Sequence, residues 1–428
     1  MDNSSSVFGK TLLKHFDFDP DYRNLNHGSF GTAPRAIREH MKYHESLSEA
    51  NPDGYIRYDF PTILDESRAA IAQLINTPLE CTVFVANASV GVNTVLRNLA
   101  WNDDCKDQIL YFDTVYGGCG KTIDYVVDAS YGRVSSRAIN LTYPCEDEEV
   151  IKAFHAALDE CKAVGKRAKI CLFDTVSSLP GVRFPFEEMT KACREAGVLS
   201  LIDGAQGVGM IDLDVGALDP DFFFSNCHKW LFTPRSCAVF YVPLRNQHMI
   251  TSTIPTSHGY VPRTGSRPNP LPASDKSPFV INFEFTGSAN TTAYACVKYA
   301  IEWRERVLGG EARITQYIQQ LARKGGNTMA NILGTEILDN KSRSMSQCGM
   351  ANVALPIDVE MMTVGTRDWM TKYMLKHHNT FIPLYTFHGR AWARVSAQVY
   401  LDLDDFEWAG RMLLELCEKA KHGGGSKL

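Results

Sequence analysis

The chain contains 428 residues, of which 44% are hydrophobic and 22% are charged, and its formal net charge is −5. This balance excludes wholesale disorder, and a slightly acidic chain is a poor candidate for bulk binding of nucleic acid or of an anionic membrane surface. No run of about 18 apolar residues occurs, so no membrane span is expected. The 12 cysteines are dispersed and none has CxxC spacing, which favours reduced thiols in an intracellular protein.

The predicted elements alternate along most of the chain. Residues 1–20 are expected to form an N-terminal arm or a short helix. From about residue 21, apolar runs alternate with amphipathic stretches that have helical spacing. The runs lack polar alternation, which is typical of strands covered on both faces in a mostly parallel sheet. The clearest of these runs are 82–86, 109–113, 169–174, 199–203, 221–225 and 238–242.

Towards the C-terminus the pattern changes. Residues 256–282 are rich in Pro, Ser and Gly and predict a long loop. A long helical stretch then begins near residue 288 and leads into a smaller α+β part. We therefore predict a large α/β domain over 21–285 and a small C-terminal domain over 286–428.

The last three residues are Ser426, Lys427 and Leu428, the tripeptide that the peroxisomal import receptor reads. The glycines at 423–425 resemble a linker, so a chance occurrence of the tripeptide stays open. The expected localisation is cytoplasmic or peroxisomal.

Three familiar motifs fail on inspection. Residues 120–122 resemble the end of a phosphate-binding P-loop, but Val115 stands where that loop needs a glycine. The HMKYH segment lacks the glutamate of a zinc protease helix, and no metal site is predicted. Residues 203–209 do not match the GxGxxG pattern of dinucleotide-binding folds.

Polar side chains follow two of the predicted strands. The run 199–203 ends in Asp203, and the next run is followed at once by His228 and Lys229. In an open parallel sheet the carboxyl ends of the strands form the rim where ligands bind. An acid, a histidine and a lysine on that rim suit pyridoxal 5′-phosphate, because a lysine amine condenses with its aldehyde and a carboxylate keeps its pyridine nitrogen protonated. A phosphate would fit the first turn of the helix predicted after Asn87.

Three segments, SNCHKWLFTPR, LIDGAQGVGM and LNHGSFGTAP, resemble the class V aminotransferase family of fold-type I pyridoxal-phosphate enzymes. This family includes the cysteine desulfurases and isopenicillin N epimerases, and the resemblance runs over nearly the whole chain. Within the family, the segment YGGCGKTIDYV resembles the group of fungal hercynylcysteine sulfoxide lyases of ergothioneine biosynthesis. Fungal enzymes of alkaloid biosynthesis share much of the remainder.

The resemblance implies roles around the cofactor ring. Lys229 would bind the cofactor covalently, and Asp203 would pair with the ring nitrogen. Gln206 would hydrogen-bond the ring hydroxyl or the imine, and Ser177 would approach the ring hydroxyl. Two residues would be catalytic: Tyr116 would stack on the ring and protonate a leaving sulfur, and Lys229 would take the α-proton of the substrate.

The resemblance also implies a phosphate site. The amide of Ala88 and the hydroxyl of Ser89 match the phosphate-binding turn of the family, and His228 would contact the same phosphate. The family places a serine two residues before its His-Lys pair. Here that position is Asn226, with Ser225 beside it, and which of the two meets the phosphate stays open.

The remaining implied residues bind substrate or join two subunits. Thr286 or Ser288 matches a segment that the family lends to the phosphate of a partner subunit, which implies a homodimer with shared active sites. Arg394 matches the arginine that holds the α-carboxylate of an amino-acid substrate. Asn26 and His27 would lie near the substrate. Arg57, with Tyr58 beside it, would reach a second carboxylate or an imidazole.

The implied reaction is β-elimination from a cysteine S-conjugate or sulfoxide, which releases pyruvate and ammonia. The alternative is an epimerase, or an enzyme forming carbon–carbon or carbon–nitrogen bonds in fungal secondary metabolism. A non-catalytic family member is disfavoured, because Lys229 and Asp203 are both present.

Overall fold

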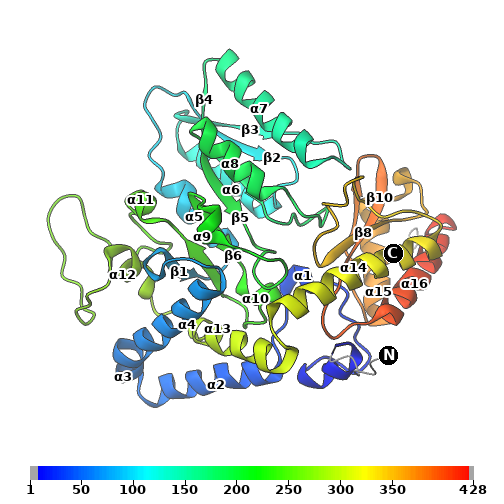
Figure 1. The fold of residues 1–428 in the computed structure, drawn as a ribbon, viewed down its shortest axis with the longest axis horizontal. Coiled ribbons are helices and arrows are strands. Elements are labelled where there is room, and N and C mark those ends of the chain that lie inside the picture. Colours follow the sequence, from blue (N-terminus) through cyan, green and yellow to red (C-terminus); the bar gives the residue numbers. More distant parts are fainter. Residues whose placement is uncertain (1–7, 424–428) are drawn as a thin grey trace.

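The computed structural model describes residues 8–423, and its centre is a seven-stranded sheet with the order β1-β7-β6-β5-β4-β2-β3 (Figure 1). The strands are β1 (Thr82–Val85), β2 (Asp107–Phe112), β3 (Val134–Ile139), β4 (Arg167–Asp174), β5 (Leu199–Asp203), β6 (Phe222–Ser225) and β7 (Ala238–Tyr241). Neighbours from β6 through β3 are parallel, and β7 is antiparallel to both β1 and β6. The mostly parallel α/β prediction is confirmed.

All six predicted runs form strands of this sheet, and one of its strands was missed. Strand β3 reads VSSRAI, and its four central residues are only partly buried. It lies at the edge of the sheet, where one side is unpaired. An edge strand tolerates polar side chains, so the apolar signal used for the other strands is absent there.

Helices cover both faces of the sheet, which explains the continuous apolar runs. On one face Leu172 and Leu201 join an apolar layer with α5 (Ala88–Asn98) and α6 (Gly117–Ala129). On the other face Phe173 and Ile202 pack with α7 (Asp147–Ala163) and α8 (Phe186–Ala196). Side chains therefore alternate between two layers along each buried strand.

A smaller α+β region follows, as predicted. Its antiparallel sheet has the order β8-β10-β9. The strands are β8 (Met350–Ala354), β9 (Leu384–Phe387) and β10 (Arg390–Ser396), and the helices are α13 (Thr292–Trp303), α14 (Glu311–Leu333), α15 (Val364–His378) and α16 (Leu403–Lys421). The predicted loop at 256–282 is irregular until α12 (Pro278–Glu284) begins. The domain boundaries at residues 20 and 285 stay predictions.

The other elements are short or lie near the N-terminus. The helices are α1 (His27–Phe30), α2 (Arg35–Ala50), α3 (Pro52–Gly54), α4 (Phe60–Leu74), α9 (Val215–Leu218), α10 (Cys227–Trp230) and α11 (Leu244–Gln247). The 3₁₀ turns are η1 (Lys10–His15), η3 (Leu79–Cys81) and η5 (Val359–Met361), and the π-helical turns are η2 (Tyr55–Asp59) and η4 (Arg304–Leu308). The N-terminal segment is anchored on the C-terminal region, because the Gly9 amide donates to the Val399 carbonyl at 2.7 Å.

All cysteines are free thiols, and Cys105 is the exposed one. No helix within residues 8–423 has the length and apolar character that crossing a bilayer requires. The terminal tripeptide of Ser426, Lys427 and Leu428 lies outside the described residues.

Candidate active site

Lys229 lies in the single turn of α10, directly after β6 at the carboxyl edge of the sheet. Its ammonium makes no hydrogen bond or ion pair with any residue of the described chain. Burial lowers the pKa of Lys229 to about 8, although the charge of Asp203 opposes this effect. A buried amine with a depressed pKa carries a substantial neutral fraction near physiological pH, which makes it a competent nucleophile and base.

Asp203 ends β5 and is buried beside this lysine. One oxygen, Oδ1, accepts the amide of Ala205 at 2.9 Å, and the other, Oδ2, accepts the thiol of Cys119 at 3.3 Å. Burial raises the pKa of Asp203, while these two donors and the charge of Lys229 counteract the rise. Three groups thus favour a carboxylate at a place where desolvation alone would neutralise it.

The N-terminus of α5 offers donors for a phosphate. Asn87 caps the helix by accepting the Val90 amide at 3.0 Å, and the amide of Ala88 donates to Oδ1 of Asn226 at 2.9 Å. The hydroxyl of Ser89 and the side-chain amide nitrogen of Asn226 form no hydrogen bond within residues 8–423. These free donors surround a helix N-terminus, where an anion is stabilised.

Ser225 and His228 flank this turn in different ways. The hydroxyl of Ser225 donates to the Gly204 carbonyl and accepts the Val208 amide at 2.9 Å, so it secures the loop after β5. Nδ1 of His228 donates to the Cys237 carbonyl at 2.9 Å, which leaves Nε2 without a hydrogen bond in the described chain. Burial lowers the pKa of His228 to about 4. Of the two candidates left open by the sequence, Asn226 has the unused donor.

The two residues expected near the ring hydroxyl are engaged inside the protein. Nε2 of Gln206 donates to the Gly28 carbonyl at 2.7 Å, and its Oε1 accepts the indole of Trp230 at 2.7 Å. The hydroxyl of Ser177 donates to the Pro180 carbonyl at 2.7 Å. Both side chains therefore brace loops at the carboxyl edge.

Arg394 on β10 is buried, with 2% of its surface exposed, and no carboxylate in residues 8–423 pairs with it. Nη1 donates to the Ser178 carbonyl at 2.8 Å, and Nη2 donates to Oδ1 of Asn26 and to the Ser29 hydroxyl at 2.7 Å each. Its Nε is buried without a partner. A buried cation without a counter-ion is costly, so this guanidinium is poised for an incoming anion.

His27 supports the lysine from behind. Its Nε2 donates to the backbone carbonyl of Lys229 at 2.7 Å, so its Nδ1 accepts the hydroxyl of Tyr400 at 3.0 Å. Burial lowers the pKa of His27 to about 3, which keeps the ring neutral. Both ring nitrogens therefore have partners within the protein, and the placement of His27 near the substrate stays a prediction.

Tyr116, in contrast, precedes α6, is 50% exposed and leaves its phenol without a partner in the described chain.

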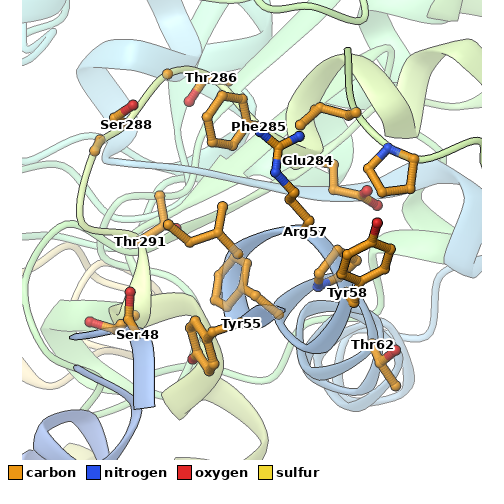
Figure 2. Close-up of a pocket in the computed structure, with 18 of the residues that line it drawn as sticks. Ser48, Tyr55, Arg57, Tyr58, Thr62, Glu284, Phe285, Thr286, Ser288 and Thr291 are labelled. Atoms are coloured by element: carbon orange, nitrogen blue, oxygen red, sulfur yellow. The ribbon is translucent and has the colours of Figure 1, made fainter. Parts of the chain in front are cut away.

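Arg57, Thr286 and Ser288 lie elsewhere in the chain. They line a separate cavity of about 530 Å³, shown in Figure 2, and neither Lys229 nor Arg394 lines it. The guanidinium of Arg57 pairs with an acid at the start of the same helical segment. Thr286 and Ser288 also line a second cavity with Val85 and Val90, beside the start of α5, but neither Lys229 nor Arg394 lines that one either.

The family model for class-V aminotransferases matches residues 25–364. The chain belongs to this family. It is 34% identical to the L-cysteine desulfhydrase-like protein lolT1 of Epichloe uncinata, covering 97% of this chain and 98% of that protein. It is 31% identical to the hercynylcysteine sulfoxide lyase of Schizosaccharomyces pombe, covering 96% of this chain and 99% of that protein.

The solved structures of the cystine C-S lyase C-DES share the fold. A complex with cysteine persulfide has a TM-score of 0.74 at 19% identity and covers 95% of this chain and 99% of that chain. A C-DES mutant with glycine covalently linked to its cofactor has a TM-score of 0.76 at 18% identity, with 94% and 99% covered. This likeness establishes fold type I.

As a member of the class-V aminotransferase family, the chain is a pyridoxal-phosphate enzyme. The described residues fit that cofactor. An unpaired amine suits its aldehyde, a buried carboxylate suits its ring nitrogen, and free donors at the start of α5 suit its phosphate.

Two residues of this site were missed from the sequence. Cys119 gives no sequence signal, because its partner Asp203 is 84 positions away. Asp174 ends the run 169–174 in the same way that Asp203 ends the run 199–203, so the sequence pattern could have predicted Asp174 at the same edge of the sheet.

Proposed function

We propose that this enzyme is a carbon–sulfur lyase that acts on a cysteine S-conjugate or S-oxide by β-elimination. The observation that carries the proposal is a pair of cations, the half-buried Lys229 and the buried Arg394, neither of which has a counter-ion in residues 8–423. They are close enough for the charge of Arg394 to lower the pKa of Lys229. Such a pair suits a substrate that carries both an amino group and a carboxylate.

When bound, pyridoxal phosphate supplies the electron sink that makes the α-proton of an amino acid acidic. The chain supplies the rest. Arg394 holds the α-carboxylate, and its anchors on Asn26 and Ser29 fix the direction of its fork. The amine of Lys229, with a pKa of about 8, takes the α-proton as general base.

Release of the sulfur group requires a proton. The electron pair of the broken Cα–H bond forms a Cα–Cβ double bond, and the Cβ–S bond breaks with its pair leaving on sulfur. The free phenol of Tyr116 is the proposed donor to that sulfur. Addition of water to the remaining three-carbon enamine yields pyruvate and ammonia, which balances the reaction.

The substrate class rests on the relatives. Two of them, at 34% and 31% identity, are called a cysteine desulfhydrase-like protein and a hercynylcysteine sulfoxide lyase. Both names describe chemistry at the sulfur of a cysteine-derived substrate. We therefore favour a sulfur leaving group, and a hercynylcysteine sulfoxide substrate in ergothioneine biosynthesis is the specific form of the proposal.

The test is a product assay on a panel of cysteine, cystine, an S-alkylcysteine sulfoxide and hercynylcysteine sulfoxide. We expect pyruvate from at least one of them, and none from K229A. Recovery of substrate with inverted α-carbon and no pyruvate would instead establish an epimerase. Pyruvate release by K229A would contradict the assignment of the base.

We further propose a homodimer with shared active sites. Arg57, Thr286 and Ser288 lie apart from Lys229 within one chain, and Tyr58 beside them is 65% exposed. If a second copy covers this cavity, Arg57, Thr286 and Ser288 of the first copy would reach the cofactor of the second.

The test mixes K229A with R57A: each variant is expected to be inactive alone, and the mixture is expected to regain activity. A mixture that stays inactive, or a monomer in solution, would contradict the shared site.

A further inference from the structure

The carboxyl edge of the sheet holds a second buried acid. Asp174 ends β4, is 7% exposed, and is the register partner of Asp203 at the end of β5. Paired residues on adjacent parallel strands face the same side of a sheet. Leu172 and Leu201, two positions before the aspartates, both face α5 and α6. The two carboxyls therefore lie side by side on the face that α5 and α6 cover.

The two aspartates differ in their hydrogen bonds. Asp203 accepts an amide from Ala205 and a thiol from Cys119. Asp174 has no hydrogen bond or ion pair with any residue from 8 to 423. Two neighbouring buried carboxyls share a proton, because both cannot carry a charge at low dielectric. Asp203 accepts two hydrogen bonds, which stabilise its ionised form, so the shared proton resides on Asp174.

The surrounding charges agree with this placement. Burial and the charge of Asp203 raise the pKa of Asp174 well above its ordinary value, and only Lys229 from α10 opposes the rise. The other titratable groups close to Asp174 are Cys119 of α6 and Tyr143 after β3, and burial raises the pKa of both. Both therefore stay neutral and add no counter-charge that would ionise Asp174.

The two side chains predicted to lie near the ring hydroxyl of the cofactor already have hydrogen-bond partners within the protein. The amide of Gln206 has each end in a hydrogen bond, and the hydroxyl of Ser177 donates to the Pro180 carbonyl. Asp174 is a buried acid of this edge, and its carboxyl has no hydrogen bond with any residue from 8 to 423. We propose that Asp174 belongs to the cofactor site as a neutral acid, which donates a hydrogen bond to the ring hydroxyl oxygen of pyridoxal phosphate. This inference rests on the family cofactor and applies to elimination and epimerisation alike.

The test exploits the matched pair of aspartates. The dissociation constant of pyridoxal phosphate is measured by titrating apoprotein with cofactor, for wild type, D174N, D174A and D203N. An asparagine at 174 keeps a donor, so D174N should bind within about 3-fold of wild type, whereas D174A should bind about 10-fold more weakly. D203N should also weaken binding, because position 203 needs a charge. Equal losses in D174N and D174A, or no loss in D174A, would overturn the proposal.

A second readout needs no cofactor. Infrared difference spectra between wild-type and D174N apoprotein at neutral pH should contain a protonated-carboxyl C=O stretch that the variant lacks. A band that survives in D174N would overturn the proposal even if D174A fails to fold. Pyruvate release by wild type is scored separately, so a failure of the lyase assignment is distinguishable from a failure of this one.

Discussion

Lys229 is half-buried and Arg394 is buried, and neither of these two cations has a carboxylate partner in the described chain. Arg304 provides the contrast, because this fully buried arginine pairs with Glu311. An arginine kept for structure acquires its counter-ion from the protein, whereas one kept for a ligand leaves the place of the anion open. The lack of a partner, more than burial, supports the proposed role of Arg394 in binding the substrate carboxylate.

Removing the charge of Arg394 should therefore weaken substrate binding. In R394A we expect KM to rise roughly 100-fold, since a buried charge-assisted contact is worth several kcal/mol. R394K should fall between R394A and wild type, because lysine keeps the charge but loses the two-pronged geometry. Steady-state kinetics with the best substrate of the panel measures this. An unchanged KM in R394A would place the carboxylate elsewhere; the cofactor absorbance of the variant serves as the folding control.

The position of helix α5 is determined at its N-terminus by the end of strand β1 and by the residue that caps the helix. Strand β1 stops at Val85, Asn87 caps the helix, and Asn226 from the turn after β6 accepts its first amide. These contacts fix the direction of the helix and leave Ser89 free at its start. The phosphate site thus depends on two loops that follow different strands of one sheet.

Ser89 should matter only to a ligand that carries phosphate. S89A is expected to bind pyridoxal phosphate about 10-fold more weakly, because it loses one hydrogen bond to a charged group. Pyridoxal, which has no phosphate, should bind S89A and wild type equally, and this comparison is the internal control. Fluorescence titration of the apoprotein measures both ligands. An equal loss for pyridoxal would show that Ser89 supports the helix rather than the phosphate.

The unpaired amine of Lys229 lowers the free energy of unfolding of the apoprotein. The pKa of Lys229 falls from 10.5 to about 8 because burial disfavours the charged form. Below pH 8 the lysine is protonated in both the folded and the unfolded chain, so the folded state carries the full cost. Between pH 8 and 10.5 the folded chain loses the proton first, and the cost is relieved.

Replacing this lysine by an apolar side chain should stabilise the apoprotein. At pH 7 we expect K229M to be more stable than wild type by about 3 kcal/mol, an upper value since solvent reaches part of the site. The advantage should shrink as the pH rises from 8 towards 10.5. Denaturant titrations of both apoproteins at several pH values measure it. A difference that does not depend on pH would mean that the amine is paired or hydrated in solution.

The sequence was sufficient for six of the seven strands of the large sheet, because apolar runs that end in polar residues indicate locally where burial begins and stops. It also predicted that Lys229 and Asp203 lie on the same edge of the sheet, and the structure adds that their strands, β6 and β5, are neighbours. It was not sufficient to tell which polar groups are free. Gln206 bonds Gly28 across 178 positions, and His27 bonds the Lys229 carbonyl across 202 positions. A donor is available to a ligand only if no other part of the chain has used it, and that depends on how distant segments pack together.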